Sequence, residues 1–274
     1  MQPTELDLPR LIDGLVPLIR AAGDAVMSVY QTDFDVETKG DESPVTAADR
    51  LAEEVILAGL RELTPAIPVV AEEEAAAGNI PDVSACFWLV DPVDGTKEFI
   101  SRNGEFTVNI ALVRHGKPVL GLVLAPALER LFYGAEGVGA WLEDKQGKRP
   151  IRVRSVPSAG LTVVGSRRHG DDNAVDAYLA GRPIAERRSV GSSLKLCLVA
   201  EGGADVYPRF GRTMEWDIAA GDAVLRAAGG LVTTLDGSEL AYGKAGFDNP
   251  HFVAWGGTRL RAAAVCPARA DYFK

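Results

Sequence analysis

Apolar residues recur at helical spacing near the start of the chain. Between Leu8 and Tyr30 they repeat every three or four positions, and this spacing predicts one amphipathic helix with a single buried face. Pro17 lies inside the segment, where it either kinks the helix or restarts it. The positions that share this spacing are Leu11, Leu15, Leu18, Ile19, Ala22 and Val26.

A second helix is predicted after a polar, turn-rich segment that covers residues 34–46. Thr46 is placed to cap this helix, because its side chain can accept a hydrogen bond from a backbone N–H of the first turn. Apolar residues recur at helical spacing from Leu51 to Leu60, and Asp49 lies in the first turn.

Two short apolar runs, residues 67–71 and 86–90, are typical of strands that are buried on both faces. Both runs end in acidic residues, with Glu72 directly after the first and Asp91 directly after the second. From residue 107 to residue 142, apolar stretches alternate with turn signals and predict an antiparallel meander.

The second half of the chain alternates strand and helix signals. The pattern as a whole predicts an α/β fold in which mixed sheets are interleaved with layers of helices, built as a single domain over residues 1–274. A loop at residues 145–150 is the expected boundary between two sub-domains, 1–149 and 150–274. The strands expected in the second half cover residues 161–166, 205–208, 231–234 and 252–254, and the helices cover 173–179, 193–201 and 216–228.

Composition narrows the class of protein. Hydrophobic residues make up 47% of the chain, which excludes a disordered protein. The formal charge of -9 argues against nucleic acid polymers as partners, although a small phosphorylated molecule stays compatible with it. Three cysteines without paired spacing predict a reducing, cytoplasmic setting. No apolar stretch is long enough to span a membrane, and peripheral association with the inner membrane stays open.

The acids around residues 91–96 point to a metal site. Asp91 and Asp94 flank Pro92, and Gly95 follows, so a tight turn is expected to aim both carboxylates at one point. Oxygen ligands of this kind suit a hard cation such as Mg²⁺, and a bound cation removes the cost of placing like charges together. His115, His169 and His251 are too scattered to suggest another metal.

Gly95 and Thr96 are expected to open a short helical turn, residues 97–101, whose free N–H groups would face the same point. A phosphate could be held there. The alternative is that Thr96 serves only as a helix cap.

A second group of residues is a candidate for recognition of the substrate. Val190, Gly191, Ser192 and Ser193 precede a helix and could offer backbone and hydroxyl groups to a phosphate or ribose, with Lys195 close behind. A simple helix cap is the alternative. A basic cluster at residues 166–169, Ser166, Arg167, Arg168 and His169, is a candidate for a second phosphate, as is Arg209, and a solvated loop is the alternative for each.

Three segments together carry a family resemblance. They read AEEE at 71–74, WLVDPVDGTKEF at 88–99 and MEWDIAAGDAVLRAAGG at 214–230. In these segments the chain resembles the magnesium-dependent, lithium-sensitive phosphomonoesterases of the inositol monophosphatase superfamily. The resemblance implies a layered αβαβα fold and two or three magnesium ions as cofactors.

Within that superfamily the chain is most similar to the bacterial 3'(2'),5'-bisphosphate nucleotidases. The stretches that carry this finer match cover residues 94–113, 190–211 and 213–217. Lys97, Glu98 and Phe99 matter most, because inositol monophosphatases tend to carry Thr-x-Asn-Phe at the equivalent place.

The resemblance also implies roles for single residues. Thr96 together with Glu72 would orient the attacking water, and Asp49 would assist a third, weakly held metal. The residues expected to bind magnesium are Glu72, Asp91, the carbonyl of Val93, Asp94 and Asp217, and those expected to be catalytic are Glu72, Thr96, Asp94 and Asp49. The residues expected to bind the substrate are Glu72, Val93, Asp94, Gly95, Thr96, Gly191, Ser192, Lys195 and Asp217.

The function that follows is hydrolysis of the 3'-phosphate of adenosine 3',5'-bisphosphate to AMP, with in-line attack by an activated water. The resemblance implies that the sulfated nucleotide is a further substrate and that the role is removal of a by-product of sulfate assimilation. The alternatives are an inositol-phosphate or sugar-phosphate phosphatase and a non-catalytic nucleotide or metal sensor. The partner is thus a small phosphorylated nucleotide, and the chain is expected to be a monomer or a homodimer.

Overall fold

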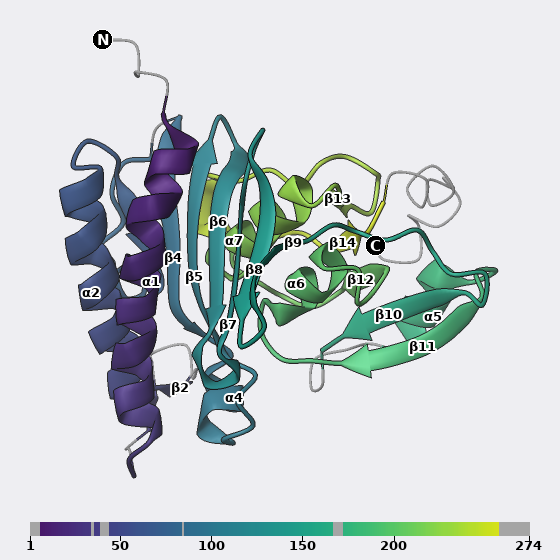
Figure 1. Cartoon of the computed structure of the whole chain (residues 1–274), viewed down its shortest axis with the longest axis horizontal. Helices are drawn as coiled ribbons and strands as arrows, with labels where there is room; N and C mark the ends of the chain where they lie inside the picture. Colours follow the sequence, from purple (N-terminus) through teal and green to yellow (C-terminus); the bar gives the residue numbers. More distant parts are fainter. Residues whose placement is uncertain (1–5, 34–35, 39–43, 84, 167–171, 258–274) are drawn as a thin grey trace.

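The computed structural model describes residues 6–33, 36–38, 44–83, 85–166 and 172–257. Helices and sheets alternate in five layers (Figure 1). Helices α1 (Leu8–Tyr30) and α2 (Ala47–Leu63) cover one face of a seven-stranded sheet. Helices α6 (Leu194–Ala200) and α7 (Glu215–Ala227) separate that sheet from a five-stranded one, and α5 (Asp172–Leu179) packs on the far side. The predicted α/β fold with interleaved layers is confirmed.

Two long helices form as their sequence patterns predict. Helix α1 is continuous through Pro17, and the Asp7 side chain caps it by accepting the Arg10 N–H at 3.0 Å. Helix α2 starts with a capping box, in which the Thr46 hydroxyl accepts the Ala48 N–H and the Asp49 carboxylate accepts the Thr46 N–H. The apolar faces of both helices lie against the first sheet.

The seven-stranded sheet has the order β3-β4-β5-β6-β7-β8-β9. Strand β3 runs parallel to β4, and the remaining neighbours are antiparallel, so the predicted meander is confirmed. The expected loop at 145–150 is wrong, because β8 and β9 pair as a hairpin in this segment. The division into two sub-domains stays a prediction. The strands are β3 (Val69–Ala71), β4 (Cys86–Asp94), β5 (Thr107–Arg114), β6 (Lys117–Ala125), β7 (Arg130–Ala135), β8 (Gly139–Asp144) and β9 (Gly147–Pro150).

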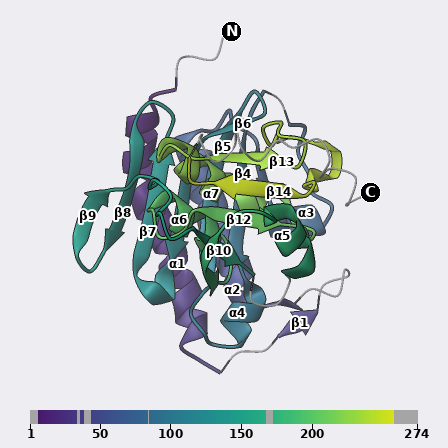
Figure 2. The same ribbon diagram turned by 90° about the vertical axis from the view of Figure 1, so that its right-hand side faces the viewer.

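The five-stranded sheet has the order β11-β10-β12-β14-β13 and mixes parallel and antiparallel pairs. Figure 2 views the molecule from the side of α5, with this sheet in front of α1. Sequence reasoning missed β11, because this edge strand is exposed and rich in charged residues and therefore has no apolar run. The strands are β10 (Leu161–Gly165), β11 (Ile184–Ser189), β12 (Val206–Arg209), β13 (Leu231–Thr234) and β14 (Phe252–Trp255).

The remaining elements are short. They include two short helices, α3 directly after β3, which the sequence pattern did not predict, and α4 directly after β4, which confirms the helical turn expected near residues 97–101. Among the described residues, no helix combines the length and the apolar character that crossing a membrane requires. These elements are β1 (Glu37–Thr38), β2 (Pro44–Val45), α3 (Glu72–Ala76), α4 (Thr96–Ile100) and the 3-10 turns η1 (Pro126–Leu128) and η2 (Ala245–Phe247).

Small residues let α7 lie very close to the first sheet. A Cβ atom added at Gly121 of β6 would stand 2.3 Å from the Ala220 carbonyl oxygen, so the two backbones are nearly in contact. On the opposite side of α7, a Cβ at Gly221 would stand 2.6 Å from a methyl carbon of Leu196 in α6. The Ala-Ala-Gly run of α7 therefore explains how this helix fits between the sheet and α6.

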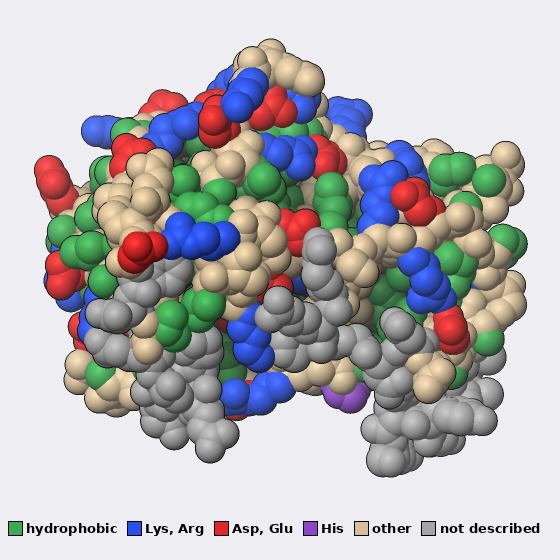
Figure 3. All heavy atoms as spheres, turned by 90° about the horizontal axis from the view of Figure 1, so that it is seen from below, with side chains coloured by type: hydrophobic (Ala, Val, Ile, Leu, Met, Phe, Trp, Pro, Cys, Tyr) green, Lys and Arg blue, Asp and Glu red, His purple; other side chains and the backbone are tan. Residues whose placement is uncertain are grey.

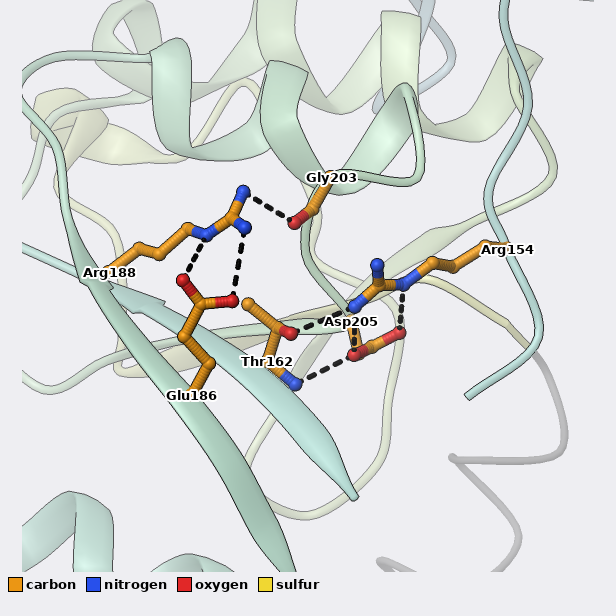
Figure 4. Close-up of polar contacts among 6 residues, drawn as sticks. All are labelled: Arg154, Thr162, Glu186, Arg188, Gly203 and Asp205. Atoms are coloured by element: carbon orange, nitrogen blue, oxygen red, sulfur yellow. Dashed lines mark hydrogen bonds and ion pairs between the residues drawn. The ribbon is translucent and has the colours of Figure 1, made fainter. Parts of the chain in front are cut away.

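An ion pair between half-buried Arg154 and buried Asp205 ties the segment after β9 to the second sheet (Figure 4). The Arg154 guanidinium donates to both carboxylate oxygens of Asp205, at 2.9 and 2.8 Å, and Asp205 also accepts the Thr162 N–H at 2.7 Å. The Asp205 side chain is fully buried, whereas a second pair nearby, Arg188 with Glu186, is exposed. The two pairs have similar bidentate geometry and differ in burial.

We expect Asp205→Ala to lower the free energy of unfolding by about 3 kcal/mol, because it leaves Arg154 and the Thr162 N–H without their acceptor. Urea denaturation followed by circular dichroism measures this change. Glu186→Gln is the matched control and should change the stability little, since exposed ion pairs contribute little. Equal losses for the two variants would contradict the structural role of Asp205.

Candidate functional site

A pocket of about 380 Å³ lies where β4, α3, α4, α6 and α7 meet. Figure 3 looks at the molecule from the side on which α4 lies, and the described part of this face carries acidic and basic side chains in a mixed pattern. The pocket likewise contains both acidic and basic side chains. It is lined by Glu72, Asp94, Gly95, Thr96, Lys97, Glu98, Ser166, Gly191, Ser192, Ser193, Lys195, Leu196, Tyr207, Arg209, Arg212, Thr213, Asp217 and Ile218.

A β-bulge brings Asp91 and Asp94 to the same side of β4. In a regular strand, residues three apart point to opposite faces. Here Asp91 pairs with Asn109 and Asp94 pairs with Thr107, so three steps along β4 match two steps along β5. Directly opposed residues share a face, and the extra residue in β4 thus turns both carboxylates the same way. The tight turn predicted from the sequence is instead this bulge within β4.

Glu72 joins these two acids because β3 runs parallel to β4. Ala71, the last residue of β3, is paired with Val90, so Glu72 directly follows β3 at the level where Asp91 begins the bulge of β4. Asp217 reaches the same place from the first turn of α7, where its carboxylate accepts the Met214 N–H at 2.8 Å.

Burial and mutual repulsion govern the acidity of this group. Burial raises the pKa of Asp91 well above its usual range, and the charges of Glu72, Asp94 and Asp217 raise it further. The pKa of Asp217 is raised by burial and by Asp94 and Glu72. Burial raises the pKa of Asp94 to about 6, although Lys195 and the Ser193 N–H favour its charged form. The charges of Glu72, Asp94 and Asp217 therefore make neighbouring aspartates of the group harder to ionise.

The donor set fits a hard divalent cation. All of the converging ligands are carboxylate oxygens, and a bound cation would offset their repulsion. Among the described residues, no three Asp, Glu, His or Cys side chains already form a closed cluster of metal ligands. Magnesium does not need such a cage, because it usually binds one or two carboxylates and completes its shell with water and substrate oxygens. An open, acidic pocket is compatible with that mode.

Thr96 and Val93 contact each other beside the acids. The Thr96 hydroxyl donates a hydrogen bond to the Val93 carbonyl at 3.3 Å. Gly95 precedes α4 with φ +89°, a left-handed conformation that favours glycine, and this sharp bend allows the helix to begin directly at Thr96. Gly95 and Thr96 line the pocket as predicted, whereas the Val93 side chain is buried outside it.

Asp49 lies outside the pocket lining. Its carboxylate accepts hydrogen bonds from the backbone N–H and the hydroxyl of Thr46, and its side chain is buried. Burial raises the pKa of Asp49 to about 6, and Glu73 and Glu72 contribute to this rise by repulsion. Asp49 therefore helps to cap α2 in this structure, and its role toward a metal stays a prediction.

The segment before α6 contributes the other wall of the pocket. The Ser193 N–H donates to Asp94 at 2.5 Å, which joins two residues that are 99 positions apart. A Cβ added at Gly191 would stand 2.6 Å from the Glu105 carbonyl oxygen, so only glycine permits this approach. Ser193 is the N-cap residue of α6, but its side chain makes no capping bond, whereas the Ser192 hydroxyl accepts the Leu194 N–H at 3.5 Å. The alternative that this segment caps the helix therefore stays open.

The Ser193 hydroxyl instead belongs to a buried polar network under Asp94. It lies 2.8 Å from the Thr107 hydroxyl and donates to the Asn109 amide oxygen at 2.8 Å. Thr107 and Asn109 are the β5 residues that face Asp94 and Asp91 across the bulge. The network therefore fastens α6 to the part of the sheet that carries the two acids.

Lys195 supplies a buried positive charge next to the acids. Its ammonium group donates to the Ser192 carbonyl at 2.5 Å and lies over the Tyr207 ring. Burial lowers the pKa of Lys195 to about 8, while the charge of Asp94 opposes this change. Ser192 has φ +47°, a strained conformation for a residue other than glycine, and it places Ser192 at the pocket wall.

Of the other residues that line the pocket, the sequence analysis named some as candidates and did not name others. Ser166 and Arg209 line the pocket, whereas Arg167, Arg168 and His169 lie outside the described residues. Sequence reasoning missed Tyr207, Arg212 and Thr213 as pocket residues. Their proximity to the motif around Asp217 was the available signal, but their side-chain types alone are not distinctive.

Comparisons with known proteins identify the family to which the sequence is similar. The inositol monophosphatase family matches residues 7–269. The 3'(2'),5'-bisphosphate nucleotidase CysQ of Salmonella typhimurium is 50% identical over 245 residues, which cover 88% of this chain and 98% of that protein. The CysQ protein of Escherichia coli (strain K12) is 49% identical over 245 residues, with the same coverage of both chains.

The fold of the chain is similar to that of a solved structure with a related sequence. The crystal structure of CysQ from Bacteroides thetaiotaomicron superimposes with a TM-score of 0.78 at 37% identity, and the match covers 92% of this chain and 99% of that one. The family match over almost the whole length and the identity to full-length relatives lead to one conclusion: the chain belongs to the inositol monophosphatase family.

Proposed function

We propose that the protein is a magnesium-dependent 3'(2'),5'-bisphosphate nucleotidase that hydrolyses adenosine 3',5'-bisphosphate to AMP and phosphate. The observation that carries this proposal is the meeting of Glu72, Asp94 and Asp217 in one pocket that also contains Lys195 and Arg209. The similarity to proteins named CysQ supports the choice of a bisphosphorylated nucleotide. The sulfated form of the nucleotide is a further proposed substrate.

Glu72, Asp91, Asp94, Asp217 and the Val93 carbonyl are the proposed magnesium ligands. When bound, magnesium would supply neutralisation of phosphoryl charge and a lower pKa for the attacking water. All of these ligands are oxygen atoms at the edge of the sheet, as a hard cation requires.

Thr96 and Glu72 are the proposed partners of the attacking water. Because the Thr96 hydroxyl donates its proton to the Val93 carbonyl, its oxygen is left as an acceptor for an O–H group of that water. Glu72 lines the pocket with a carboxylate that can accept the proton of the same water. The N–H groups at the start of α4 and the Lys195 ammonium group face the negative charge of the phosphate.

Two arginines of the pocket suit the second phosphate of a bisphosphate. Arg209 and Arg212 lie beside each other, with an Arg209 N–H donating to the Arg212 carbonyl at 3.0 Å. An inositol monophosphate has no second phosphate for these groups. We infer that Arg209 favours the nucleotide over monophosphorylated sugars. We also infer that the reaction takes place in the cytoplasm, which suits a cysteine such as Cys197 that forms no disulfide.

A substrate panel tests the function. We expect phosphate release to be fastest with adenosine 3',5'-bisphosphate and slower with inositol monophosphate and fructose bisphosphate, to stop when EDTA removes magnesium and to be inhibited by Li⁺. Colorimetric detection of phosphate measures the rates. A clear preference for either sugar phosphate would contradict the nucleotidase assignment.

Asp94→Asn serves as the control in the same panel. We expect it to lower kcat roughly 100-fold or more, because it removes a charged magnesium ligand while keeping the size of the side chain. If the wild-type protein binds the nucleotide with magnesium but shows no turnover above that of Asp94→Asn, a non-catalytic sensor becomes the better description.

Arg209→Gln tests the recognition of the second phosphate. We expect KM for adenosine 3',5'-bisphosphate to rise by about tenfold, because a charge-assisted hydrogen bond is lost, while KM for adenosine 3'-monophosphate changes little. Initial rates over a range of both substrates measure the difference, and Arg61→Gln, on the exposed end of α2, is the control. An equal rise for both nucleotides would contradict the assignment.

A further inference from the structure

Glu53 is a buried carboxylate outside the pocket that is in contact with the helix carrying Glu72. It belongs to α2, and its side chain is 4% exposed. One carboxylate oxygen accepts the Glu73 N–H at 2.9 Å, and the other accepts the Glu74 N–H at 3.0 Å. Both donors belong to the first turn of α3, whose first residue is Glu72.

Helix α3 has no cap of its own. Ala71, the residue before it, has no side chain that could accept a hydrogen bond. The first N–H groups of a helix have no partner within the helix and need an acceptor from elsewhere. Glu53 meets this need for two of them at once, from α2 and from a position 20 residues before Glu73 in the chain.

The position of Glu53 is unfavourable for a residue whose task is stability alone. Burial raises the pKa of Glu53 to about 7, and the charges of Glu73 and Glu74 contribute to this rise, although the two N–H groups oppose it. A polar residue at position 71 would cap α3 without a buried carboxylate. A cap supplied from α2, by contrast, also fixes where the start of α3 lies relative to α2 and to the end of β4.

We propose that Glu53 is a positioning residue for the magnesium site, which holds the first turn of α3 so that Glu72 faces Asp91 and Asp94, and thereby sets the affinity for magnesium. This inference rests on the proposed function, because it takes the acidic group as the magnesium site. Glu53 is not part of the pocket lining, and it acts through the backbone N–H groups of Glu73 and Glu74.

The test is a magnesium titration of full-length variants without substrate. Glu53→Ala removes both acceptors, Glu53→Gln keeps one carbonyl acceptor at the same size, and Glu54→Gln changes the exposed neighbour on the same helix. The melting temperature is measured against magnesium concentration, and the magnesium dependence of phosphate release is measured in parallel.

We expect the half-saturating magnesium concentration to rise about tenfold or more in Glu53→Ala, because partners that orient metal ligands typically contribute this much to affinity. Glu53→Gln should show a smaller rise, and Glu54→Gln none. At saturating magnesium, kcat of Glu53→Gln should return close to the wild-type value, since the ligands themselves are intact.

A purely structural role would give a different result. In that case the melting temperature of both Glu53 variants would fall without magnesium, but their half-saturating magnesium concentration would equal that of the wild type, and the inference would be overturned. If Glu53→Ala does not fold, Glu53→Gln carries the same comparison. Wild-type protein that magnesium stabilises but that does not hydrolyse the nucleotide would overturn the proposed substrate, while the titration would still decide the role of Glu53.

Discussion

Repulsion among carboxylates is the constraint on which this structure depends. Asp91, Asp94, Glu72 and Asp217 come from three different elements, and the charges of Glu72, Asp94 and Asp217 each raise the pKa of at least one other member of the group. Such an arrangement is unfavourable unless something holds the groups together. Here backbone hydrogen bonds and strand pairing keep the four acids in place, and these interactions do not depend on whether the acids are ionised.

The layers around the site provide this rigidity. The bulge in β4 is fixed by pairing with β5, and the network of Ser193, Thr107 and Asn109 fastens α6 to the same strand. Close backbone contact at Gly121 holds α7, and with it Asp217, against the sheet. The acids are thus placed by parts of the fold that also form the main core between the sheets, so the site and the core share their determinants.

The sequence predicted a large part of the fold, for reasons that concern single segments. Helix α1 follows from apolar spacing, α2 from the cap at Thr46, and β4 from an apolar run, and all of these signals depend on neighbouring residues in the chain. Strand β9 was predicted as part of a loop, because its residues are polar and do not alternate with apolar ones. The exposed strand β11 was not predicted, because its charged residues also lack an alternation with apolar ones.

For the site, the sequence by itself determined which acids follow the apolar runs, and the resemblance of its motifs added the family and the ligand set as expectations. Only the tertiary structure decided that Asp91 and Asp94 share a face, because the bulge exists only in the pairing of β4 with β5. It also decided that Ser193 binds Asp94 across 99 positions and that Glu53 caps α3. Contacts of this kind depend on strand register and helix packing, which no local pattern encodes.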